Sequence, residues 1–125
     1  MESTMIILDL DYPPSANTYW RHARGRHYIG EKGLAFRAKV ADLVAMHNLK
    51  ADEGRLELSV MLYPPDKRKR DIDNVCKALL DSLTFAGLIE DDSLIDKLTI
   101  ERGTVVKGGK CRIYLQPYTI RNDII

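Results

Sequence analysis

The sequence predicts an α+β fold: a two-layer single domain, with a mixed β-sheet carrying helices on one face. Residues 5–10 and 56–62 have strand character, whereas 31–48 and 72–85 repeat apolar residues at helical spacing. The expected order is strand, helix, strand, helix, strand, strand, which is typical of helices packed against one sheet. A chain of 125 residues is long enough for one core. We therefore expect a single domain over 1–125.

Four strands are expected. The first, at residues 5–10, ends at Pro13-Pro14 because proline cannot donate to a sheet. The second alternates apolar and polar residues, as a half-buried strand does; its apolar positions are Leu56, Leu58, Val60 and Leu62. The last two, at 94–101 and 111–115, are expected to form a hairpin closed at Lys107-Gly108-Gly109-Lys110.

Two helices are expected between these strands. Phe36, Val40 and Val44 lie on one stripe of the first. The second, from residue 72 to about 85, has an apolar face and an opposite polar face, and Gly87 is placed to end it. The apolar face carries Ile72, Val75, Cys76, Leu79 and Leu83, and the polar face carries Asp73, Lys77 and Asp81 at four-residue steps.

The composition limits the classes of function. Lys and Arg number 19 against 18 Asp and Glu, a net charge of +1, so any nucleic-acid surface has to be a local patch. No apolar run approaches the roughly 20 residues of a membrane span, and Met1-Glu2-Ser3-Thr4 lacks the basic start of a signal peptide. We therefore expect a cytoplasmic protein without membrane association.

The most informative segment joins a basic run to two carboxylates. Lys67-Arg68-Lys69-Arg70 is followed at once by Asp71-Ile72-Asp73-Asn74, with Lys77 one helical turn later. A basic run attracts phosphate, whereas carboxylates repel it unless a divalent cation lies between them. The combination predicts a nucleic-acid backbone site with metal chemistry.

Geometry restricts how these carboxylates can share an ion. On a regular helix Asp71 and Asp73 would point about 200° apart, so they converge only if Asp71 lies in the loop or at the cap. A third ligand has to come from elsewhere, and Asp91 and Asp92 are the candidates. Mg²⁺ suits such a site because it takes oxygen ligands and keeps several waters.

Other interpretations of these residues remain open. Asp71 and Asp73 can serve only as helix cap and first-turn acid, and the basic run can be only a solvated turn. Lys77 can stabilise charge on a phosphate or pair with Asp73 or Asp81.

A second segment, residues 19–28, interleaves cations with aromatic side chains. The cations are Arg21, Arg24 and Arg26, and the aromatic residues include Tyr19, Trp20 and Tyr28. This composition suits phosphate contact and base stacking. The alternative is a basic loop or hairpin that contacts no ligand.

The motifs together resemble the RusA family of Holliday junction resolvases, and the resemblance covers most of the chain. It rests on Pro13-Pro14-Ser15-x-Asn17, Glu31-Lys32-Gly33-Leu34-Ala35-Phe36-Arg37, the run from Lys67 to Lys77, Ala86-Gly87 followed by Asp91-Asp92, and Lys107-Gly108-Gly109.

The resemblance implies a homodimer that binds four-way DNA junctions and makes two symmetric nicks with Mg²⁺, Mn²⁺ being a substitute ion and no organic cofactor being needed. The implied metal ligands are Asp71, Asp73 and Asp92, with Asp91 in reserve and Lys77 also needed for cleavage. DNA contacts are expected from Arg21, Arg24, Arg26, Lys67, Arg68, Lys69 and Arg70. Recombination or repair of DNA, as in a prophage, is the implied setting.

Two rival functions stay open at this point. One is a non-catalytic protein that binds DNA junctions. The other is a general metal-dependent nuclease for other branched or flap substrates.

Overall fold

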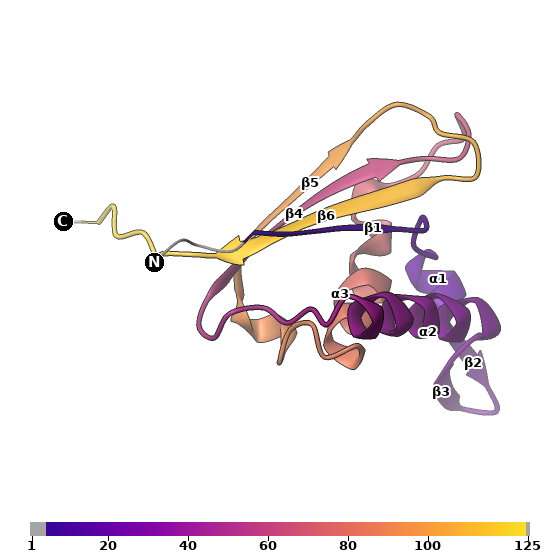
Figure 1. Cartoon of the computed structure of the whole chain (residues 1–125). Coiled ribbons are helices and arrows are strands. Elements are labelled where there is room, and N and C mark those ends of the chain that lie inside the picture. The colour runs from indigo at the N-terminus through magenta and orange to yellow at the C-terminus, as the bar shows by residue number, and fades with distance from the viewer. Residues whose placement is uncertain (1–4, 125) are drawn as a thin grey trace.

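The computed structural model describes residues 5–124 (Figure 1). A four-stranded sheet forms one layer and the helices lie on one of its faces, so the predicted α+β architecture is confirmed. Met1–Thr4 and Ile125, included in the expected single domain, lie outside the described residues. The elements are β1 (Ile6–Leu10), α1 (Ala16–Tyr19), β2 (Trp20–Ala23), β3 (Arg26–Ile29), α2 (Glu31–Met46), β4 (Leu56–Tyr63), the 3₁₀ segment η1 (Ile72–Val75), α3 (Cys76–Phe85), the 3₁₀ segment η2 (Asp92–Leu94), β5 (Ile95–Arg102) and β6 (Lys110–Pro117).

The sheet has the strand order β1-β6-β4-β5. β4 is parallel to β5 and antiparallel to β6, and β6 is antiparallel to β1. The alternating pattern of β4 buries every second residue against the helices, as predicted from its sequence. Because α3 connects β4 to β5, those two strands run the same way, as a helical crossover requires.

The predicted hairpin between the last two strands is wrong. β5 and β6 lie on opposite sides of β4 and do not pair. Gly108 and Gly109 do form a turn with φ of +84° and +77°, but the turn belongs to a loop that crosses the end of β4. That loop is held there because the Gly103 N–H donates to the Leu62 carbonyl at 2.7 Å.

α2 and α3 pack against one another and supply the core beneath the sheet. Their buried residues are Gly33, Phe36, Val40 and Val44 from α2 and Ala78, Leu79, Ser82 and Leu83 from α3. The second predicted helix is present, but its first four residues form η1. None of the helices in residues 5–124 is long and apolar enough to cross a membrane.

Residues 20–29 form a separate two-stranded hairpin, which we call the arm. It projects from the helix layer on the side away from the sheet (Figure 1). Its turn residues, Arg24 and Gly25, have φ of 52° and 74°, as a type I′ turn requires at both central positions. The segment thus has the form of a hairpin, and its contact with DNA stays a prediction.

Candidate functional site

The basic run forms a loop at the end of β4, before η1. The loop borders an open cavity of about 750 Å³ whose walls include all four predicted cations and Asp71. The remaining lining comes from Pro64, Asp66, Asn74, Arg102, Gly103 and Val105. The cavity thus brings the predicted phosphate-binding residues next to one of the predicted metal ligands.

Asp66 organises this loop, a role that the sequence analysis missed. Its Oδ1 accepts from the Arg68 backbone N–H at 2.9 Å and from Arg70 Nη1 at 2.7 Å. These bonds, that from Arg70 above all, hold the pKa of the Asp66 carboxyl well below its usual range. Asp66 directly precedes the basic run, so its position in the sequence was the available signal.

The four cations of the loop therefore differ in what they are free to bind. Arg68 and Arg70 both form ion pairs with Asp66. Lys67 and Lys69 are exposed and form no ion pair within residues 5–124. A phosphate backbone approaching the cavity would meet two free ammonium groups beside two guanidinium groups that already have a carboxylate partner.

Arg102, the last residue of β5, contacts the basic loop from the side of the sheet. Its Nη2 donates to the Arg70 carbonyl at 2.5 Å, and the Arg70 guanidinium carbon lies 6.0 Å from the centre of the Tyr12 ring. Arg102 was not among the predicted site residues. No local pattern marks it, because it acts on a residue 32 positions earlier.

Asp71 and Asp73 begin η1, the arrangement in which a shared ion is geometrically allowed. Asp71 occupies the N-cap position in extended conformation, φ −75° and ψ 133°, but its side chain accepts no cap hydrogen bond. Asp73 is in the first turn, and both residues are exposed. Because the Asp71 carboxylate is not used for capping, the interpretation of Asp71 as only a cap is not supported.

Lys77 lies on the exposed face of α3, one turn after Asp73. It forms no ion pair in the part of the chain that the structure describes. Asp81, one of the partners that the sequence allowed for it, instead accepts a hydrogen bond from the Tyr19 hydroxyl. The Lys77 ammonium group is thus available to a ligand.

The second acidic pair divides into a capping and a free residue. Asp91 caps η2, since its Oδ2 accepts from the Ser93 backbone N–H at 3.1 Å and from the Ser93 hydroxyl. Ser93 thereby lowers the pKa of Asp91. Asp92 is exposed and its side chain accepts no hydrogen bond within residues 5–124. This difference favours Asp92 over Asp91 as a ligand.

The two acidic sites lie at opposite ends of β4. The Arg70 carbonyl is bound by Arg102, which pairs with Leu62 near the end of β4. The Ser93 carbonyl accepts from Arg55 at 2.6 Å, just before β4 begins at Leu56. The six-residue separation between Leu56 and Leu62 corresponds to about 20 Å of strand. Consistently, residues 5–124 contain no group of three or more His, Cys, Asp or Glu side chains that could hold one metal ion.

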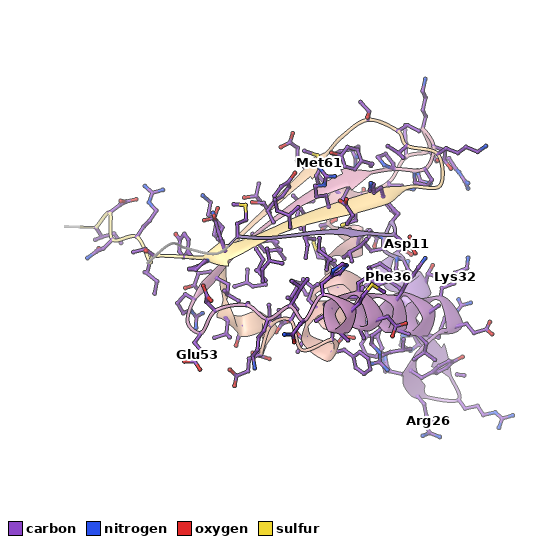
Figure 2. The ribbon with its side chains drawn as sticks, in the orientation of Figure 1. Asp11, Arg26, Lys32, Phe36, Glu53 and Met61 are labelled. Atoms are coloured by element: carbon purple, nitrogen blue, oxygen red, sulfur yellow. The ribbon has the colours of Figure 1, made fainter. Side chains whose placement is uncertain are left out.

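The arm presents the second set of predicted DNA ligands. Arg21, Arg24 and Arg26 are exposed and form no ion pair among the described residues, and Arg26 points away from the body of the protein (Figure 2). A cavity of about 410 Å³ at the base of the arm combines cationic and aromatic walls. It is lined by Ala16, Asn17, Trp20, Arg21, His22 and Tyr28.

Comparison with known proteins identifies one family to which the chain is similar. The model of the family described as "Endodeoxyribonuclease RusA" matches residues 11–116. The chain belongs to the RusA family. Three curated relatives agree. A "Crossover junction endodeoxyribonuclease rusA" of Enterobacteria phage HK97 is 44% identical over 107 residues, covering 83% of this chain and 88% of the relative. Proteins named "Crossover junction endodeoxyribonuclease RusA" from Escherichia coli and Shigella sonnei are each 36% identical over 109 residues, covering 85% of this chain and 89% of theirs.

The RusA match extends over every part of the candidate site. It begins directly after β1, includes the arm, the basic loop and both acidic sites, and ends at residue 116 within β6. The family resemblance inferred from the motifs is therefore confirmed. The individual roles of Asp71, Asp73, Asp92, Lys77 and the cations stay predictions.

Proposed function

We propose that this RusA-family chain is a crossover junction endodeoxyribonuclease, which resolves four-way DNA junctions by hydrolysing one phosphodiester bond in each of two strands. The observation that carries the proposal is the 44% identity to the phage enzyme of that name, across 88% of the enzyme's length. The geometry supports it, because Asp71 and Asp73 open η1 directly beyond a loop of cations.

We further propose Mg²⁺ as the metal ion, with Mn²⁺ as a substitute, held by Asp71, Asp73 and Asp92. The donors fit this ion, since all three are exposed carboxylates and neither Asp71 nor Asp92 is used as a cap. Such an ion lowers the pKa of bound water and offsets negative charge on the phosphate.

The separation of about 20 Å along β4 bears on how this set could assemble. We propose a homodimer in which each site takes Asp71 and Asp73 from one chain and Asp92 of the partner subunit. A two-fold dimer then holds two equivalent sites. This number matches the two equivalent strands that have to be cut to resolve a junction.

The remaining side chains of the site act on the DNA itself. Water adds to the phosphorus atom and the bond to the leaving oxygen breaks, while Lys77 stabilises the negative charge that develops on the phosphate. Lys67 and Lys69 bind the flanking backbone, and Arg21, Arg24 and Arg26 bind it from the arm. Arg68 and Arg70 add to the positive field of the loop while shaping it. As an enzyme of recombination and repair, the protein would work in the cytoplasm.

The test compares a labelled four-way junction with a linear duplex, with and without Mg²⁺. We expect paired nicks in the junction only when Mg²⁺ is present. Asp73→Asn should abolish nicking while binding the junction as tightly as the wild type or more tightly, because a negative charge facing phosphate is removed. Full cleavage by this variant would reject the assignment.

The same experiment separates the rival functions. Binding of the junction without nicking, both with and without Mg²⁺, would identify a non-catalytic junction-binding protein. Equal cleavage of the linear duplex and the junction would identify a general metal-dependent nuclease, and a flap substrate added to the same comparison would show whether branched DNA of other kinds is cut.

A further inference from the structure

We propose that Tyr19 is a positioning residue whose hydrogen bond to Asp81 sets the arm at a defined angle to the helix that carries the candidate site. The inference rests on the proposed role of the arm in DNA binding. It concerns a residue that the proposed chemistry does not use.

The bond joins two elements that are distant in the sequence. Tyr19 is the last residue of α1, immediately before the arm, and its side chain is fully buried, with 0% exposure. Its hydroxyl donates to the Asp81 carboxylate of α3. Asp81 lies one turn after Lys77 on the same face of that helix. Tyr19, which we call the root of the arm, is therefore hydrogen-bonded to α3, the helix that also carries Lys77.

Packing around Tyr19 holds the root on its other sides. Trp20 meets the Tyr19 ring edge-on, with ring centres 5.6 Å apart. The Gly30 N–H donates to the Tyr19 carbonyl at 2.9 Å and so closes the base of the hairpin. The backbone of α2 approaches closely at Gly33, where a Cβ would lie 2.9 Å from Tyr19 Cδ1 and 2.7 Å from Ile29 Cγ2.

The hydrogen bond of the Tyr19 hydroxyl makes the contact between Tyr19 and α3 directional. Apolar contacts are non-directional, whereas the bond to Asp81 is directional. Burial and the Asp81 carboxylate raise the pKa of Tyr19 to about 12, so the phenol stays a donor at neutral pH. From Trp20 to Ala23 the arm extends by about 10 Å. A rotation of about 10° at the root would thus move its tip by about 2 Å, enough to misplace a contact with the DNA backbone.

The fluorescence of Trp20 can report on the contact between Tyr19 and Asp81. Trp20 is the single tryptophan of the sequence, it packs on Tyr19, and its indole nitrogen is buried. In Tyr19→Phe we expect the Trp20 emission maximum to shift to longer wavelength and quenching by acrylamide to increase. Junction affinity should fall on the order of tenfold, the usual scale for a hydrogen bond to a charged group. The single-turnover cleavage rate at saturating junction should stay within twofold of wild type.

Matched variants isolate the bond. Asp81→Ala should reproduce Tyr19→Phe and carries the same test if Tyr19→Phe does not fold, whereas Asp81→Asn retains an acceptor and should restore near-wild-type affinity and emission. Tyr114→Phe removes a tyrosine hydroxyl from β6, in the sheet layer, and should change neither quantity.

Two results would overturn the inference: unchanged junction affinity and Trp20 emission in both Tyr19→Phe and Asp81→Ala, or a loss confined to the saturated cleavage rate. Neither the measurement of Trp20 emission nor that of junction affinity requires the protein to cleave DNA. A wild-type protein that binds but does not nick would therefore overturn the proposed function and leave this test intact.

Discussion

The Arg70 guanidinium is held against the Asp66 carboxylate, with Nη1 2.7 Å from Oδ1. The same nitrogen donates to the carbonyls of Asp66 and Arg68 at 3.2 and 3.3 Å. One side chain thus gathers three acceptors of the loop. Arg70 therefore holds the conformation of the basic loop in addition to giving it positive charge. These two contributions to DNA binding can be measured separately.

Arg70→Lys keeps the charge and removes the planar fork that reaches several acceptors at once. We expect junction affinity to fall by about threefold to tenfold, on the hydrogen-bond scale, while the dependence of affinity on salt concentration stays unchanged. The measurement is a salt titration of the dissociation constant. Lys69→Ala is the contrasting variant, because loss of one phosphate contact lowers the salt slope by about 0.9. Wild-type affinity in Arg70→Lys would mean that Arg70 contributes charge alone.

Mixed dimers test whether Asp92 acts across a subunit boundary. Asp73→Asn and Asp92→Asn homodimers should each be inactive. If each site combines Asp73 of one chain with Asp92 of the partner subunit, a dimer with one variant of each kind has one intact site. We expect such mixtures to nick one strand of the junction per binding event. If both residues served one chain, every site in the mixed dimer would carry a mutation, and the mixture would remain inactive.

Gly33→Ala should destabilise the protein although alanine favours helix by about 1 kcal/mol. The added Cβ would lie 2.7 Å from Ile29 Cγ2 and 3.0 Å from the Tyr19 carbonyl oxygen. Overpacking of this kind costs about 1–3 kcal/mol, which urea unfolding measures. Ala38→Gly, at an exposed position of α2, should cost about 1 kcal/mol from helix propensity alone. A more stable Gly33→Ala would show that α2 can move away from the root of the arm.

The Asp9–Arg112 pair predicts part of the acid sensitivity. Arg112 Nε donates to Asp9 Oδ1 at 2.7 Å across the β1–β6 ladder and lowers the Asp9 pKa from 3.8. A carboxyl whose folded pKa is depressed stabilises the fold above its unfolded pKa and loses that contribution as pH falls through the folded value. We therefore expect Asp9→Asn to lose stability less steeply below about pH 4 than wild type does.

The measurement is the urea midpoint between pH 7 and pH 2.5. Asp52→Asn, at an exposed residue without an ion pair in the described part of the chain, is the control. An Asp9→Asn profile that runs parallel to the wild type throughout would contradict the prediction.

Local periodicity was enough to predict most of the elements. The alternation from Leu56 to Leu62 and the helical spacing of Phe36, Val40 and Val44 reflect burial of one face, a property that adjacent residues share. Strand pairing is different. The turn at Gly108 and Gly109 has the local chemistry of a hairpin, yet β6 pairs with β4 and β1 because the crossover through α3 puts β5 on the other side of β4.

The sequence by itself determined the residue types of this protein's chemistry: a cationic run ending in two aspartates, a second acidic pair and a segment of interleaved cations and aromatic residues. Tertiary structure decided which of those groups are free and which are already partnered. It put Arg102 against the Arg70 carbonyl, Tyr19 against Asp81, and Asp92 at the far end of β4 from Asp73. The reason is that side-chain identity is local, whereas hydrogen-bond partners and distances depend on how strands and helices remote in the chain are brought together.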